Sequence, residues 1–399
     1  MQYKYKAVGD NGQIIEGIFE ATGEQEVINM LRNSNRMPIS IEETGDSGAS
    51  HSISFGKVKK KDLAIFCRQF YTMLNAGVSI IKTLDILGKQ SENKLMKKAI
   101  ENVYNSVQKG MALSEAMKNM PKVFPPILIN MVEAGEASGN LDTIMDRMAA
   151  HYEKEFKMEN KIKGAMIYPM VLAVAATGVV VFLMVFVMPT FIGMFESSGV
   201  ELPGPTKALL AVSNSMQNQW YVYIIAIVVL VFTIRLIGKS DGGALLFDTI
   251  KLRLPVFKNT NVKVATSRFT RTLSTLMSSG IPLIQGIDIV SRVIGNRYIR
   301  NKLESAKEEV RKGVPLSRTI KDTNVFPPMV DSMINIGEES GALDDILNKT
   351  ADFYDEEVEA ALQKMTEMMQ PVMIVVMASI VGFIVLAIAL PMFDMVSTM

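Results

Sequence analysis

Three long apolar stretches interrupt an otherwise mixed polar pattern along the chain. Ala165–Met188 holds 24 residues without a charge, Met368–Phe393 holds 26, and Trp220–Ile234 is apolar throughout. A helix that crosses the hydrocarbon core of a bilayer needs about 20 apolar residues. The pattern therefore predicts three transmembrane helices over 165–189, 216–237 and 368–393.

The basic residues around these stretches predict an orientation. Four lysines precede the first apolar stretch, basic residues follow the second, and one lysine precedes the third. The loop 190–215 contains a single basic residue, Lys207. Positive residues are retained on the cytoplasmic side. We therefore expect a cytoplasmic N-terminus, an external loop over 190–215 and an external C-terminus. The basic residues used are Lys154, Lys157, Lys161, Lys163, Arg235, Lys239 and Lys364.

The chain also contains one phrase twice. VFPPILINMVEAGEASGNLDTI begins at Val123 and VFPPMVDSMINIGEESGALDDI at Val325, and 12 of the 22 aligned residues are identical. The similarity extends upstream to Phe66 and Phe269 and downstream to the paired prolines Pro189 and Pro391. It thus includes the first and third apolar stretches. Two copies with the same orientation need one return helix between them, and the middle stretch supplies it.

Each copy has the apolar spacing of a helical bundle. Apolar residues recur every three or four positions, and glycines such as Gly77 and Gly280 mark the expected helix ends. We expect six helices in each copy, over 59–163 and 262–366. The predicted fold class is mainly α: a polytopic membrane protein with two homologous cytoplasmic six-helix bundles, three transmembrane helices and a small N-terminal α+β module.

That N-terminal module occupies residues 1–44. YKYKAVGDNGQIIEGIFEA alternates apolar and polar positions on either side of Asp10-Asn11-Gly12, which is a hairpin signal. A short helical segment and a further strand, Met37–Ile41, follow. The Gly- and Ser-rich stretch over 45–58 is expected to be a flexible linker.

The repeated phrase is the candidate functional site. We interpret it as the turn between the last two helices of each copy, with Gly135 and Gly337 as left-handed caps. Its acidic residues exceed what a turn requires, so a contact with a partner protein is the alternative to a structural role, and a divalent-ion site is a third. The candidate residues are Glu133, Gly135, Glu136, Ser138, Gly139, Asp142, Gly337, Glu338, Glu339, Ser340, Gly341 and Asp344.

Composition narrows the chemistry. The net charge is +1, there is one cysteine, and of the two histidines His51 lies in the linker while His151 is expected on a helix surface. The net charge does not indicate binding to nucleic acid. The single cysteine and the two histidines cannot form a zinc site, and neither histidine forms a catalytic triad with a serine. We therefore expect no cofactor, no metal and no enzymatic activity.

The doubled FPP–M–GE–SG–LD phrase, the two helical copies and the three spans resemble the inner-membrane platform proteins of type IV pilus and type II secretion machines, the GspF/PilC family. The resemblance implies a scaffold in the bacterial cytoplasmic membrane. Its implied partners are a hexameric assembly ATPase, a pilin or pseudopilin, other inner-membrane components of the machine, and further copies of itself. The alternatives are a membrane transporter or another membrane scaffold.

Topology can be tested directly with reporter fusions. A reporter fused at Ser198 is expected to behave as external, and reporters at Lys59 and Asp241 as cytoplasmic. Alkaline phosphatase and green fluorescent protein fusions provide the measurement. An internal signal at Ser198 would contradict both the orientation and the idea of two parallel copies.

Overall fold

The computed structural model describes residues 2–8, 14–21, 23–34, 36–44, 57–191, 203–253 and 255–397. The chain divides into two compact units, Met1–Lys57 and Val58–Met399, and each is described by itself.

The first unit is a three-stranded antiparallel sheet with one helix. Its elements are β1 (Gln2–Val8), β2 (Ile14–Glu20), α1 (Glu24–Asn33) and β3 (Met37–Thr44), with strand order β2-β1-β3. Alternate residues of β1 point to one face, so Tyr3 and Ala7 meet Val27 and Leu31 of α1 in a small apolar core. The register pairs Val8 with Ile14, as the hairpin pattern predicts. The turn at Asp10–Gly12 and linker residues 45–56 lie outside the described residues.

The first helical copy follows. Gly77 and Gly110 adopt φ of 79° and 92° directly after α2 and α4, a conformation that glycine adopts without steric cost. At the start of α4, the Asn93 side chain accepts hydrogen bonds from the N–H groups of Leu95 and Met96, at 3.0 and 3.3 Å. The elements are α2 (Lys60–Asn75), α3 (Ile80–Gln90), α4 (Lys94–Gln108), α5 (Leu113–Lys118), α6 (Pro126–Ser138) and α7 (Leu141–Phe182).

The second copy repeats this order. Gly280 and Gly313 adopt φ of 80° and 91°, matching Gly77 and Gly110. Its elements are α12 (Pro255–Ser278), α13 (Leu283–Val293), α14 (Arg297–Arg311), α15 (Leu316–Asp322), α16 (Pro328–Ser340) and α17 (Leu343–Ser397). One more helix, α11 (Asp241–Arg253), precedes α12. These elements confirm the predicted fold class of two homologous helical bundles.

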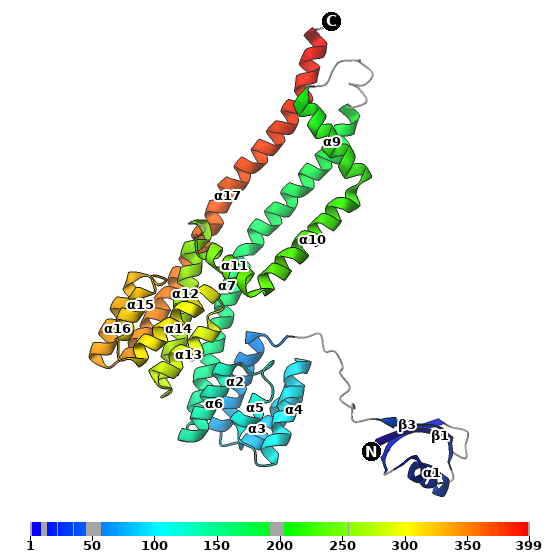
Figure 1. Ribbon diagram of the computed structural model, residues 1–399, viewed down its shortest axis with the longest axis vertical. Coiled ribbons are helices and arrows are strands. Elements are labelled where there is room, and N and C mark those ends of the chain that lie inside the picture. The colour runs from blue at the N-terminus through cyan, green and yellow to red at the C-terminus, as the bar shows by residue number, and fades with distance from the viewer. Residues whose placement is uncertain are drawn as a thin grey trace. The chain divides into compact units, whose positions relative to one another are not determined.

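Among the described residues, three helices are long and apolar enough to cross a membrane: Leu141–Phe191, Trp220–Gly238 and Leu343–Pro391. The first comprises α7, a π-helical turn, η1 (Leu183–Val187), and the residues that follow; the other two are α10 (Trp220–Lys239) and α17. Their apolar side chains are largely exposed, which is the arrangement that lipid requires of a spanning helix. The chain is therefore a multi-pass membrane protein, and both α7 and α17 run without interruption from bundle to span (Figure 1).

The segment between the first two spans differs from the expected loop. Residues 204–218 form a helix, α9 (Gly204–Asn218), and Gln219 breaks it from α10, so the second span begins at Trp220 rather than at 216. The Thr206 hydroxyl donates to the Ala387 carbonyl at 2.5 Å, and the Ser213 hydroxyl donates to the Met184 carbonyl at 2.6 Å. Helix α9 thus connects the far ends of the first and third spans.

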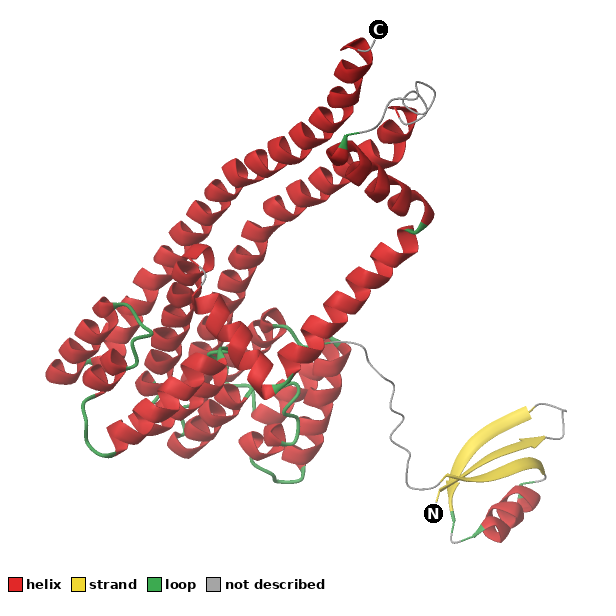
Figure 2. Cartoon of the chain, turned by 45° about the horizontal axis from the view of Figure 1, so that its top comes forward, coloured by secondary structure: helices red, strands yellow, loops and turns green. Residues whose placement is uncertain are grey.

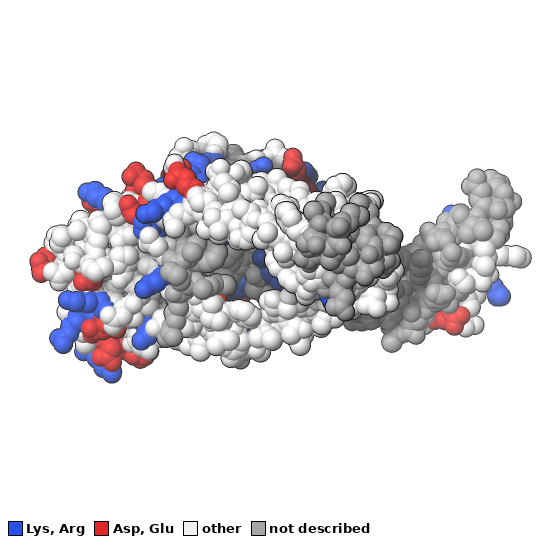
Figure 3. Space-filling model, turned by 90° about the horizontal axis from the view of Figure 1, so that it is seen from above, with Lys and Arg blue, Asp and Glu red and all other residues white. Residues whose placement is uncertain are grey.

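The two copies pack against each other along α7 and α17, which lie side by side (Figures 1 and 2). The buried apolar residues of both bundles form one continuous cluster, from Phe66 and Phe70 in the first copy to Phe269 and Leu273 in the second. Seen from above, Lys, Arg, Asp and Glu gather over the second copy, whereas the described residues of the membrane helices are mostly of other types and are drawn white (Figure 3).

Candidate functional site: the repeated turn and the contact between the copies

The repeated phrase forms helix α6 or α16, a tight turn, and the start of the long helix. Gly139 and Gly341 end the shorter helices with φ of 73° and 67°. The N–H groups of Gly139 and Asn140 both donate to the carbonyl of Gly135, the latter at 3.0 Å. The left-handed cap is therefore one turn later than predicted, at Gly139 and Gly341.

Gly135 and Gly337 have a different role from the predicted cap. Both lie inside a helix and are buried. A Cβ on Gly135 would lie 3.1 Å from the Leu141 Cα, and one on Gly337 would lie 2.9 Å from the Leu343 Cα. The contact at Gly337 is closer than real Cβ atoms show, and the contact at Gly135 is tighter than most Cβ contacts. Glycine at these positions therefore allows the long helix to fold back tightly against its predecessor.

The half-buried carboxylates of Glu136 and Glu338 are occupied within their own bundles. Glu136 accepts from the N–H of Leu113 at 2.6 Å, from the N–H of Ser114 at 3.0 Å and from the Ser114 hydroxyl at 2.5 Å. Glu338 accepts the same three bonds from Leu316 and Ser317, at 2.6, 3.0 and 2.6 Å. Helices α5 and α15 have no side-chain cap of their own, so a carboxylate from another helix satisfies their first N–H groups.

The remaining candidates are more exposed. Glu133 pairs with Lys118 at 2.9 Å, and Glu339 accepts from the Asn335 amide at 2.8 Å. Asp142 and Asp344 lie in the first turns of α7 and α17, as predicted, where a carboxylate favours the positive end of the helix dipole. Ser138 and Ser340 donate to carbonyls of their own helices. The described residues contain no group of three or more His, Cys, Asp or Glu placed to hold a metal ion.

Each bundle holds its long helix with matched ion pairs. Arg68 on α2 pairs with Asp146 and Glu153 of α7, and the corresponding Arg271 on α12 bonds Asn348 and Asp355 of α17. A second pair repeats in the same way: Lys60–Glu155 and Lys263–Glu357 both have an N–O distance of 2.5 Å. The repeat thus preserves the contacts that position the helix entering the membrane. These ion pairs were not predicted from the sequence, because the alignment of the two copies considered the glycines, prolines and apolar residues and not the charged residues at matching positions.

The contact between copies uses a different face of α7. Lys154 pairs with Asp352 at 2.8 Å, and Lys161 pairs with Glu359 at 2.5 Å. Between these pairs, Met158 packs in a small apolar cluster completed by residues of α17. Further toward the turn, the Arg147 guanidinium donates to the Ser278 carbonyl and to the Ser279 hydroxyl. The members of the apolar cluster are Met158, Val358, Leu362 and Met365, with Ile162, Ala165 and Val264 packed against them.

His151 lies close to this contact and not on the surface, as the sequence had suggested. It is 2% exposed, and in the described part of the chain neither ring nitrogen has a hydrogen-bond partner. Burial lowers the pKa of His151 below its ordinary value. The matching residue in the second copy is Phe353, which is 41% exposed. The two copies therefore share a fold but expose different residues at corresponding positions.

A duplicated helical bundle joined to three spanning helices defines a class of polytopic membrane protein. The family model for type II secretion system protein F matches residues 66–189 and 269–391, and its N-terminal domain model matches residues 1–42. The chain belongs to the type II secretion system protein F family.

Several relatives match nearly the full length. The type IV pilus assembly protein PilC of Thermus thermophilus is 39% identical, with 100% of this chain and 98% of the relative covered. PilC of Myxococcus xanthus is 35% identical, with 99% and 95% covered. The type II secretion system protein F of Vibrio cholerae is 32% identical, with 98% of each chain covered.

Removing the Glu136 carboxylate is expected to destabilise the first copy. In Glu136→Ala the N–H groups of Leu113 and Ser114 lose their acceptor, and leaving such donors unsatisfied costs about 1–3 kcal/mol. Thermal unfolding of the full-length protein in detergent measures the change. Glu133→Ala is the control, because an exposed ion pair contributes about 0–1 kcal/mol. Equal unfolding temperatures for the two variants would contradict the capping role.

Proposed function

We propose that this protein is the platform of a type IV pilus assembly or type II secretion machine in the bacterial cytoplasmic membrane. In this proposal it is not an enzyme. It couples a cytoplasmic hexameric ATPase to the insertion of pilin or pseudopilin into a filament, alongside other inner-membrane components. The proposal is supported by the family, by the names of the relatives and by the two helices that continue from bundle to membrane.

The continuity of α7 and α17 is the observation that carries the mechanism. Each helix is fixed to its own bundle by ion pairs at one end and spans the membrane at the other. A helix is stiff along its axis because every backbone hydrogen bond is internal. A rotation or shift of the bundle would therefore displace the membrane end of the same helix. The α7–α17 contact and α9 would make both spans move together.

The proposed orientation places both bundles in the cytoplasm. The lysines that precede the first span are the main support, since basic residues stay on that side. Lys154 and Lys161 among them also pair with carboxylates of α17, so they serve the contact between copies as well as the orientation.

The acidic turns are proposed as one contact with the ATPase. Because Glu136 and Glu338 are occupied as caps, the contact would fall on the exposed acids Glu133 and Glu339. Exposed charges contribute little to stability but can steer the association of two proteins. In this proposal the turn has both a structural role and a partner-binding role. The glycines and the capping carboxylates stabilise the bundle, and the exposed acids contact the partner.

Self-association is also proposed, on the evidence of unequal burial in the two copies. Ile127 and Met131 of α6 are buried, and α6 contacts α13 of the second copy. At the corresponding positions of α16, Met329 is 37% exposed and Met333 is half-buried, and Ile336 beside them is 46% exposed. An apolar face that is covered in one copy and open in the other favours a further copy as the covering surface.

Charge reversal of the exposed acids is expected to weaken binding of the ATPase without unfolding the protein. Membranes that contain Glu133→Lys, Glu339→Lys or the double variant are solubilised, and the ATPase that copurifies is quantified by mass spectrometry at low and high salt. We expect a loss of roughly tenfold for the double variant at low salt, where electrostatic steering is strongest. Glu101→Lys, an exposed change on α4, is the control.

If the ATPase copurifies equally with all variants, the acidic turns are not part of the interface. If no assembly ATPase or pilin copurifies with the unmodified protein, the proposed function itself is contradicted.

A further inference from the structure

Helix α11 closes a cleft in the second copy. It has no counterpart in the repeat, and it lies against α12 and α14. Leu252 packs on the apolar core of the bundle. The Asp248 carboxylate accepts from the N–H of Arg297 at 3.0 Å, and its backbone carbonyl accepts from the Asn296 amide at 3.4 Å. The helix is therefore held by an apolar contact and by a carboxylate that caps the first turn of α14.

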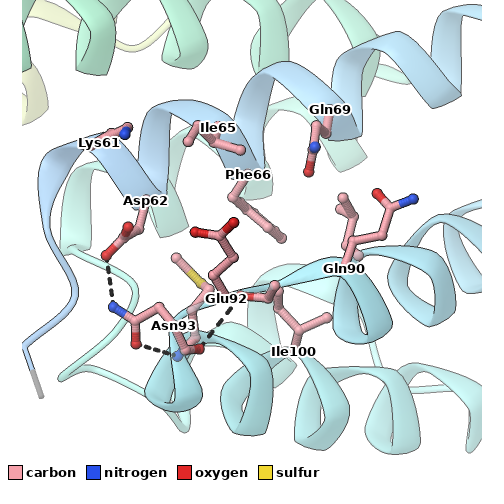
Figure 4. Close-up of a pocket in the computed structure, with 12 residues that line it drawn as sticks. Lys61, Asp62, Ile65, Phe66, Gln69, Gln90, Glu92, Asn93 and Ile100 are labelled. Carbon is pink, nitrogen blue, oxygen red and sulfur yellow. Dashed lines mark hydrogen bonds between the residues drawn. The ribbon is translucent and has the colours of Figure 1, made fainter.

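The corresponding cleft in the first copy is open. It is a cavity of about 320 Å³ between α2, the end of α3 and the start of α4 (Figure 4). Its apolar lining includes Phe66, Met96 and Ile100, and Ile65 on its rim is 45% exposed. Asn93, which corresponds to Asn296, stands at the start of α4 with its side chain in the cleft (Figure 4). Among the described residues, 57–59 directly before α2 form no helix.

The cleft that α11 covers is less polar than the cleft of the first copy. Where the second copy has the buried residues Ala265, Thr272 and Ile294, the first copy has Asp62, Gln69 and Ser91. Permanent interfaces are more hydrophobic, whereas the interface of a transient complex has an apolar centre surrounded by a polar rim. The first cleft has that composition.

We propose that the first copy binds one amphipathic helix of a partner protein in this cleft, in the way that the second copy binds its own α11. The bound helix has the length of α11, an apolar face, a carboxylate that caps α4 at Lys94, and a basic residue that faces Glu92 on the rim. The contact in the second copy specifies the apolar face and the capping carboxylate, and the charge of Glu92 on the rim of the first cleft specifies the basic residue. The site lies on the lining of the cleft and uses none of the exposed acids at the repeated turn.

Direct binding of a defined helix tests the proposal. The probe is a fluorescent peptide with the α11 sequence DGGALLFDTIKLR, added to the full-length protein in lipid nanodiscs and followed by fluorescence anisotropy. Saturable binding is expected. A peptide with Asn in place of the residue equivalent to Asp248 should bind about tenfold more weakly, because a hydrogen bond to a charged acceptor is lost.

Variants of the protein locate the peptide on the first copy. Ile65→Lys introduces a charge at an exposed position of the rim, and Gln90→Trp fills the cleft; each should weaken binding at least tenfold. Ile81→Lys, at a 41% exposed position of α3 outside the cleft, should bind as the unmodified protein does. Pilus or secretion output should fall with the first two variants and not with the third.

Two results would overturn the inference: no saturable binding, or binding that Ile65→Lys and Gln90→Trp leave unchanged, since the peptide would then occupy lipid or the second copy. Normal copurification of the ATPase in the same variants would leave the proposed function intact, so the two ideas fail separately.

Discussion

A spanning helix must run from one side of the membrane to the other, and this requirement governs how a duplicated membrane protein is connected. Each copy here is a bundle followed by a helix that enters the bilayer, and both copies have the same direction. The chain can begin its second bundle on the same side only after another crossing. Helix α10 makes that crossing, and its exposed apolar surface and lack of a repeat counterpart agree with a connecting role.

The same duplication explains how two similar bundles come to differ. Their internal contacts are maintained: the arginine that bonds the long helix, the lysine–glutamate pair and the glutamate that caps the short helix all occur twice. Their outer faces diverge, because each copy meets different neighbours. His151 is buried near the other bundle, whereas Phe353 at the matching position is exposed. Helix α11 covers a cleft in the second copy that the described residues of the first copy leave open.

Much of the architecture could be predicted from the sequence because it depends on local signals. Apolar length indicates the spans, glycine at positive φ ends α2, α4, α12 and α14, and the doubled phrase reveals the repeat. The predicted start of the second span, at 216, was four residues too early, because no charged residue marks the end of α9 and the two helices are separated by the backbone at Gln219. Helix α11 was not anticipated because the comparison of the copies excludes a segment that occurs once.

The chemistry of the repeated turn was harder to predict. Gly135 and Gly139 are both glycines in a turn-like context, and only the packing of Leu141 against the first distinguishes a close approach from a cap. The acceptor role of Glu136 depends on a helix 22 residues away in sequence. One signal was available, because α5 and α15 begin without a side-chain cap, and their N–H groups required an acceptor from elsewhere.

In the proposed function, work done on the bundles reaches the membrane through the unbroken helices α7 and α17. The most direct measurement is pilus or secretion output after insertion of Gly-Ser-Gly between Ile162 and Lys163, which lie between the Lys161–Glu359 pair and the membrane-spanning part of α7. The account predicts that output is lost while the ATPase still copurifies, and that the same insertion after Gly48 in the linker has no effect. Normal output with a flexible break in α7 would contradict it.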